Sequence, residues 1–399
     1  MILASAVCAA AACTPDPVVE VEYAPYEGDA YPDRIPPIAW PAGRTAVVTN
    51  SYGDSLSLID VATGEQLDTR PIGRNPVDLD GPHHLAADAA HGRIFVALSY
   101  PKIGGAGPHA AHGSSVSNGY VQLVDEKTLV PKASMRVDPN PGDIVLSEDA
   151  SRLIVTHFDL QRAVKNPTDL DKARATLAVI DPDSLGVAGA TPTFISICVA
   201  PHGAVLEGTS GDRAYVACYG EDSVAIVDTT DPTAAVERVP IASDVSGFGD
   251  PKYGPYALVR SPDGGTLAVS DTISKDVRFF DVASRTMDVL PKVPLQGAPY
   301  FSVFADADTL IIPTQQPDQL VRVDLTGTDE TVIHPMAANE CKLPHQVVHD
   351  DDGTFWLVCE GDHTVPGTIV HLSALFDTLS VATVGVYPDS FTFLPPVLP

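Results

Sequence analysis

Three histidines of this sequence directly follow a proline, and a fourth stands beside the first of them. The pairs are Pro82-His83, Pro201-His202 and Pro344-His345, and His84 follows His83. Imidazole is the commonest side-chain ligand of zinc, copper and iron, so a fold that brings these residues together would create a metal site. In the alternative interpretation, each imidazole only hydrogen-bonds the backbone of a neighbouring segment. Which interpretation holds depends on the elements that carry these histidines.

Those elements repeat along the chain as short strands. From residue 44 onwards, β-branched runs alternate with Gly, Asp and Pro turns, which is typical of an all-β protein. An apolar strand ending in Asp recurs, and its last copy lacks the Asp; the copies are Ser57–Asp60, Gln122–Asp125, Ala178–Asp181, Ala225–Asp228, Arg278–Asp281, Arg322–Asp324 and Thr368–Ser373. A second kind of strand begins at a proline, at Pro82, Pro141, Pro201, Pro255, Pro299, Pro344 and Pro388. The spacing between successive prolines falls to about 44 residues, and each repeat holds about four strands. This pattern predicts a seven-bladed β-propeller of four-stranded antiparallel blades.

The two ends of the repeat complement each other. The last proline strand, Val386–Phe393, has no strand after it, while the first strand pair, Thr45–Thr49 and Leu56–Asp60, has no proline strand before it. We therefore expect the C-terminal strand to become the innermost strand of the N-terminal blade. Such closure removes an exposed sheet edge.

The predicted blades sort the histidines by face. The residue after each proline should lie at one mouth of the central channel; these residues are His83, Gly142, His202, Tyr256, Tyr300, His345 and Asp389. His83, His84, His202 and His345 are therefore the candidate metal ligands. Four further histidines are expected on the same face as secondary candidates, namely His109, His112, His157 and His363. Tyr256, Tyr300 and Asp389 could act there as an acid or a base.

The repeats resemble the YVTN-type, or YncE-like, propellers of bacterial surface and periplasmic proteins. Tyr215–Ala217, Ser223–Asp228 and Ser261–Gly264 carry this resemblance, which covers roughly residues 44 to 399. The histidine ring is also weakly similar to the copper-binding propeller domain of nitrous oxide reductase, which implies copper as the slightly favoured metal. Only three proline positions here carry a His, however, and no cupredoxin domain follows. Streptogramin lyase, another seven-bladed propeller, implies that metal-dependent elimination suits the fold.

Four cysteines follow the N-terminal region in two similar pairs. Cys198 and Cys341 each open a Cys-x-x-Pro-His segment, and Cys218 and Cys359 follow 20 and 18 residues later. On the predicted blades, each pair lies side by side on one face. The sequence therefore predicts disulfides Cys198–Cys218 and Cys341–Cys359, which an exported protein keeps oxidised. Thiolate ligation of a metal remains the alternative.

The N-terminus suggests export. Residues 1–13 form a short apolar run that ends in Ala-Ala-Ala-Cys, which resembles the lipobox of bacterial lipoproteins and is too short to span a bilayer. Residues 14–43 contain seven prolines and are expected to form an acidic tether, and residues 44–399 the propeller. We expect a periplasmic or surface lipoprotein, attached to the membrane only through its lipid.

The charge balance excludes one class of partner. With 24 Lys plus Arg against 52 Asp plus Glu, the formal net charge is −28, which repels nucleic acid. The expected function is binding of a protein, glycan or small ligand by a monomeric propeller through its histidine-rich face, with a transition metal as a possible cofactor. The alternative is a metal-dependent oxidoreductase or lyase with its site at the channel mouth.

Overall fold

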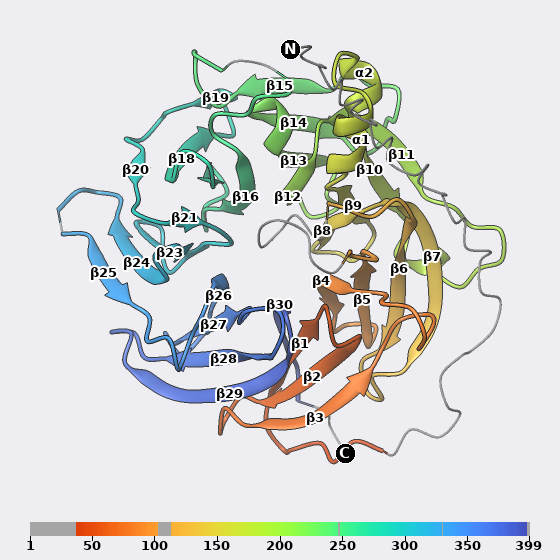
Figure 1. Ribbon diagram of the computed structural model, residues 1–399, viewed down its shortest axis with the longest axis vertical. Helices are drawn as coiled ribbons and strands as arrows, with labels where there is room; N and C mark the ends of the chain where they lie inside the picture. The colour runs from red at the N-terminus through yellow and green to blue at the C-terminus, as the bar shows by residue number, and fades with distance from the viewer. Residues whose placement is uncertain (1–36, 103–112, 246–247, 329, 397–399) are drawn as a thin grey trace, which may run out of the picture.

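Seven antiparallel sheets surround one axis in the computed structural model, which describes residues 37–102, 113–245, 248–328 and 330–396. Figure 1 shows them as blades of a ring, with one strand of each blade next to the central axis. Within these residues, five sheets have four strands, and two have a fifth short strand. The predicted seven-bladed β-propeller is confirmed.

The blades are numbered along the chain, and their strands are given from the axis outwards. Blade 1 holds β30 (Pro388–Leu394), β1 (Thr45–Asn50), β2 (Ser55–Asp60) and β3 (Gln66–Pro71). Blade 2 holds β4 (Pro82–Asp88), β5 (Arg93–Leu98), β6 (Asn118–Asp125) and β7 (Pro131–Pro139). Blade 3 holds β8 (Pro141–Leu146), β9 (Leu153–His157), β10 (Ala175–Ile180) and β11 (Thr193–Cys198). Blade 4 holds β12 (Pro201–Glu207), β13 (Arg213–Cys218), β14 (Ser223–Asp228) and β15 (Glu237–Pro240).

The remaining blades follow the same order. Blade 5 holds β16 (Pro255–Arg260), β17 (Thr266–Asp271), β18 (Asp276–Asp281) and β19 (Thr286–Met287), with β20 (Val293–Pro294) beside β18. Blade 6 holds β21 (Ala298–Pro299) and β22 (Val303–Phe304), both paired with β23 (Thr309–Gln315), and then β24 (Gln319–Asp324) and β25 (Val332–Pro335). Blade 7 holds β26 (Pro344–His349), β27 (Phe355–Cys359), β28 (Pro366–Leu372) and β29 (Thr378–Val386).

The ring closes as the sequence predicts. Strand β30 pairs antiparallel with β1, with Thr45 opposite Leu394 and Val48 opposite Phe391. Trp356 of β27 packs with Val48 and Phe391 in one buried apolar cluster between blades 7 and 1. Middle strands such as β1 are buried at every residue because a neighbouring blade covers each face, which explains their nearly continuous apolar sequences.

A repeated backbone feature opens the inner strands. In six blades the residue before the proline has a left-handed backbone; these residues are Gly81, Asn140, Ala200, Gly254, Leu343 and Tyr387. In the same six blades the pairing register then shifts just after the proline. Such β-bulges re-aim side chains. The two residues after the proline therefore do not follow the strict in-and-out alternation of a regular strand.

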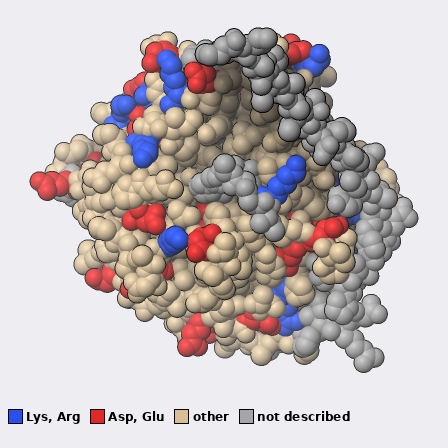
Figure 2. Space-filling view, viewed as in Figure 1, with Lys and Arg blue, Asp and Glu red and all other residues tan. Residues whose placement is uncertain are grey.

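The helices of the described residues are short. Helices α1 (Leu160–Lys165) and α2 (Leu170–Ala173) lie between β9 and β10, and 3-10 turns cover Pro182–Ser184 and Tyr219–Glu221. Within the described residues, no helix is long and apolar enough to cross a membrane. Figure 2 shows acidic side chains dispersed over one face of the ring rather than gathered in one place.

The predicted export signal (1–13) and most of the predicted tether (14–43) lie outside the described residues. The end of the tether belongs to the packed structure, because Ile38 and Trp40 pack against the apolar cluster between blades 1 and 2. The Trp40 indole also donates to the carbonyl of Lys127.

Asp54, in the turn between β1 and β2, holds the segment that leads into β4. It accepts hydrogen bonds from the backbone N–H groups of Asp80 and Gly81, just before Pro82.

Candidate metal centre

Five side chains of the types that can ligate a metal ion gather at the axis from four blades. They are His83 and His84 of β4, His202 of β12, His345 of β26 and Asp389 of β30. Ligand atoms of His83, His84 and His202 lie within 4.8 Å of one another, and so do those of His84, His345 and Asp389. We call these five residues the axial cluster. Their residue exposures are at most 4%, so the histidines are buried and do not line an open funnel as the sequence suggested.

His84 is the shared member of both groups. Its ring centroid lies 4.4 Å from that of His83, 5.6 Å from that of His202 and 5.9 Å from that of His345. Its Nδ1 lies 2.8 Å from Oδ1 of Asp143, which fixes the tautomer with the proton on Nδ1. Its buried Nε2 has no hydrogen-bond partner among the described residues. An imidazole held by a carboxylate on one nitrogen and open on the other is the usual form of a metal-ligating histidine.

Asp143 is itself held in place by the backbone. Its Oδ1 also accepts from the N–H of Ile144, and its Oδ2 accepts from the N–H of Ala204 in the next blade, each at 2.9 Å. The carboxylate therefore links blades 3 and 4 while it orients His84. This residue was missed in the sequence, although it stands two positions after Pro141, the same place that His84 occupies after Pro82.

Asp389 lies between two imidazoles. Its Oδ2 is 3.1 Å from Nε2 of His83, and its Oδ1 is 2.9 Å from Nδ1 of His345. The Nδ1 of His83 is 3.2 Å from the carbonyl oxygen of Pro141, so both nitrogens of His83 face oxygen atoms. A neutral imidazole has only one N–H, so if Nδ1 donates to Pro141, Nε2 faces Asp389 with a lone pair, and a positive charge between them would be favourable.

The charge of Asp389 also affects His345. Burial by itself would lower the pKa of His345, but the charge and hydrogen bond of Asp389, with the charge of Glu360, outweigh it and raise the pKa to about 8. The carboxylate therefore favours positive charge at this point of the axis. A metal ion would supply the same charge.

Hydroxyl groups fix the backbone that carries the cluster. Thr49 donates to the carbonyl of His83 at 2.5 Å, and Thr156 donates to the carbonyl of His202 at 2.6 Å. Ser270 makes the same bond to Tyr300 at 2.7 Å. In each case a residue of the second strand of one blade holds the innermost segment of the next blade, which is bulged in the first two cases and lies between β21 and β22 in the third. The positions of the imidazoles are thus set by contacts between blades.

Aromatic rings fill the space around the histidines. Tyr256 stacks on His202 with centroids 3.8 Å apart, and Tyr300 meets the edge of the His345 ring at 5.5 Å. Phe301, which the sequence did not indicate, lies 4.7 Å from His84 and 5.2 Å from His345. Burial raises the pKa of both tyrosines, so their phenols are neutral.

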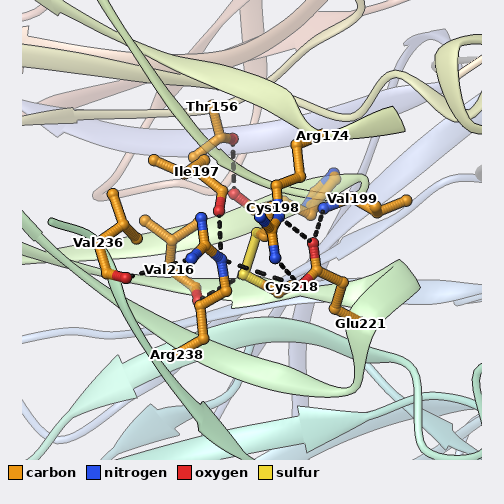
Figure 3. Close-up of a disulfide and its surroundings, with 11 residues drawn as sticks. Thr156, Arg174, Ile197, Cys198, Val199, Val216, Cys218, Glu221, Val236 and Arg238 are labelled. Atoms are coloured by element: carbon orange, nitrogen blue, oxygen red, sulfur yellow. Dashed lines mark hydrogen bonds and ion pairs between the residues drawn. A yellow bond between two sulfur atoms is a disulfide. The ribbon is translucent and has the colours of Figure 1, made fainter. Parts of the chain in front are cut away.

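Two disulfides brace the segments that lead into two of the histidines. Cys198–Cys218 and Cys341–Cys359 are both formed, with Cα atoms 5.8 and 5.2 Å apart, as predicted. Figure 3 shows the first, beside Glu221, which accepts from Arg174 and from the backbone N–H of Val199. These four cysteines are therefore not thiolate ligands.

The two secondary candidates that the structure describes, His157 and His363, do not join the axial cluster. His157 is buried at the end of β9, where its Nδ1 bonds the carbonyl of Thr176 at 2.8 Å. His363 lies in the loop between β27 and β28, bonded to Glu360 at 2.7 Å. His109 and His112 lie outside the described residues. Asp389, expected only as an acid or base, is instead placed as a candidate ligand, and the role of all these residues in metal binding stays a prediction.

The fold and this axial arrangement define a β-propeller with a histidine-rich centre. No protein-family model matches the chain, and no curated protein sequence is similar to it, so membership of the YVTN group is not established.

Solved structures share the fold. The periplasmic gluconolactonase of Pseudomonas aeruginosa is similar with a TM-score of 0.64 and 16% identity, over 89% of this chain and 99% of that one. A functionally unknown protein from Desulfotomaculum acetoxidans gives 0.63 and 10%, over 88% and 99%. Streptogramin B lyase gives 0.55 and 12%, over 80% and 91%. At these identities the likeness concerns the fold alone.

Proposed function

We propose that this chain is an exported metal-binding β-propeller that holds one transition-metal ion in its axial cluster. The observation that carries the proposal is the buried, partnerless Nε2 of His84, oriented by Asp143 and surrounded by His83, His202, His345 and Asp389. Leaving a buried polar nitrogen without a partner costs about 1–3 kcal/mol, and a bound ion would remove that cost. The two disulfides support an oxidising, extracytoplasmic location.

The distances suit an ion after a small contraction. Opposite ligands on one ion are about 4.2 Å apart when each bond is about 2.1 Å, whereas the ligand atoms within each of the two groups of three lie within 4.8 Å of one another. The rings would move inward by a few tenths of an ångström. Four imidazoles and one carboxylate favour copper, zinc, nickel or iron over magnesium and calcium.

Metal analysis of the purified protein tests the proposal. We expect about one equivalent of copper or zinc in the wild-type protein, and less than a tenth in His84→Ala. His91→Ala is the matched control, because His91 also bonds an aspartate but has a side chain that is 55% exposed. If the wild-type protein carries no transition metal and takes none up from a Cu²⁺ or Zn²⁺ titration, the proposal is wrong.

A macromolecular partner would use a different surface. Because the imidazoles are buried, a protein or glycan bound on this face would contact the rim loops and not the histidines. Binding of such a ligand would therefore survive His84→Ala, whereas metal binding would not.

A second candidate is metal-dependent catalysis on a small substrate. The neutral phenols of Tyr256 and Tyr300, packed against His202 and His345, favour it because they could donate a proton beside a bound ion. Lactone opening and elimination, the activities in the names of the similar propellers, are the reactions to assay. Turnover by the metal-loaded protein that is lost in Tyr256→Phe would support this function, and no turnover of either class would count against it.

A further inference from the structure

The buried axial cluster poses a question of access. An ion that binds there must pass the side chains that separate the cluster from solvent. Its passage is fastest along a route where protein ligands replace its bound water molecules one after another. Asp143 contacts His84 and is partly exposed, so it could receive an incoming ion. Its carboxylate, however, accepts hydrogen bonds from two backbone N–H groups, which cannot rotate away to free it. Another pair of ligand-type side chains lies close by.

Glu360 and His363 form that pair. Glu360 follows β27 and is wholly buried, and its Oε2 is 2.7 Å from Nε2 of His363. The His363 side chain is 17% exposed, so it is the outer member of the pair. The Oε1 of Glu360 accepts from the amide of Gln315 at 3.0 Å. Both of these side-chain partners can rotate away.

The pair adjoins the axial cluster on two sides. The Gln315 amide that bonds Glu360 also lies 3.4 Å from the carbonyl of Pro344, directly before His345. The backbone N–H of Glu360 donates to the carbonyl of Leu343 at 3.1 Å. The ring of His363 stacks on Tyr387, two residues before Asp389, with centroids 3.7 Å apart. Glu360 and His363 thus lie between solvent and the segments that present two members of the cluster.

We propose that Glu360 and His363 form a transfer site through which the metal ion enters and leaves the axial cluster. This inference rests on the metal-binding function proposed above. The pair offers one carboxylate oxygen and one imidazole nitrogen, which bind an incoming cation more weakly than five ligands do. The ion then passes inward to His345 and Asp389, where more ligands complete its coordination.

Stopped-flow measurement of Zn²⁺ uptake by the metal-free full-length protein, and of Zn²⁺ release to a chelator, tests the transfer site. We expect Glu360→Gln and His363→Ala each to slow uptake and release by a similar factor of at least about ten, while about one equivalent still binds. Asp362→Asn is the matched control, because this exposed acid lies between the two in the same loop and its removal changes the net charge equally.

The outcomes separate the two proposals. If the wild-type protein binds Zn²⁺ but neither variant changes the rates, the transfer site is wrong and the axial site stands. Faster uptake in His363→Ala would also overturn it, since His363 would then act only as an obstacle. A lowered stoichiometry in Glu360→Gln would make Glu360 a member of the binding site instead. If the wild-type protein takes up no ion, the axial site itself fails.

Discussion

Replacing Asp143 by asparagine tests whether His84 must be oriented by a carboxylate, because the substitution leaves the imidazole itself in place. The carboxylate now accepts from Nδ1 of His84 and from the N–H of Ala204 through different oxygens. An amide has only one oxygen, so Asp143→Asn must leave one of these donors facing an NH₂ group. Either the buried N–H of Ala204 loses its acceptor, or His84 loses the partner that fixes its tautomer.

The size of each effect follows from the contacts. One buried donor without an acceptor lowers the free energy of unfolding by about 1–3 kcal/mol. Loss of the group that orients a metal-ligating histidine lowers metal affinity by about 10–100-fold, which is about 1.4–2.8 kcal/mol of binding free energy. We therefore expect a modest loss of stability together with a larger Kd for Zn²⁺.

Competition titration with a chromophoric zinc chelator at constant pH measures this affinity. The matched control is Asp88→Asn, because Asp88 bonds Nδ1 of His91 at 2.9 Å, far along β4 from the axial cluster. Both variants should lose stability, but only Asp143→Asn should bind Zn²⁺ more weakly. Equal affinity in Asp143→Asn and the wild-type protein would refute the role assigned to this carboxylate.

Three further predictions concern the framework. Burial raises the pKa of Asp54 to about 7, so the folded state keeps a proton that the unfolded state loses above about pH 4. The free energy of unfolding should therefore fall by about 3 kcal/mol as the pH rises from about 4 to 7, and Asp54→Asn should flatten that slope in denaturant titrations. A Cβ at Gly203 would lie 2.6 Å from a backbone atom of blade 5, so Gly203→Ala should cost about 1–3 kcal/mol and weaken metal binding, whereas the roomy Gly265→Ala should change stability by less than about 0.5 kcal/mol. Replacing Cys341 and Cys359 together by serine opens a loop of 18 residues and should lower the free energy of unfolding by about 3 kcal/mol; an unchanged denaturation midpoint would contradict this.

The propeller could be predicted because its signals repeat. Six blades carry a proline at the start of the inner strand, and blade 6 has Pro299 at the end of β21. Most blades also carry an Asp at or just after the end of the third strand, so single exceptions such as the copy at Thr368–Ser373 do not hide the period. The lone strand at Val386–Phe393 predicted the closure with β1, and the paired Cys-x-x-Pro-His segments predicted both disulfides.

The detail of the site could be predicted only in part. The position directly after the inner-strand proline correctly predicted that His83, His202, His345 and Asp389 lie near one another. The direction of the His84 side chain could not be predicted, because the β-bulge after Pro82 breaks the alternation of the strand. Burial of the axial cluster depends on aromatic side chains from several blades, such as Phe301, and no local sequence pattern predicts these contacts.

Two other residues had weaker signals. Asp143 could have been found by comparing the second residue after each proline, which is His84 in blade 2. Glu360 directly follows a disulfide cysteine, yet its pairing with Gln315 depends on the packing of blade 7 against blade 6. Contacts between residues of different blades do not recur at a fixed sequence separation, so the sequence does not reveal them.

Ring closure by β30 has a consequence for biogenesis. Asp389 lies on β30, which follows all the other described strands along the chain and completes blade 1, whereas its partner His83 lies near the beginning of the ring. A nascent chain emerging from a ribosome or a translocation channel therefore has its imidazoles long before it has the carboxylate. Only after β30 has been released can the first blade be completed, so a product truncated before β30 would lack both a closed ring and this candidate ligand.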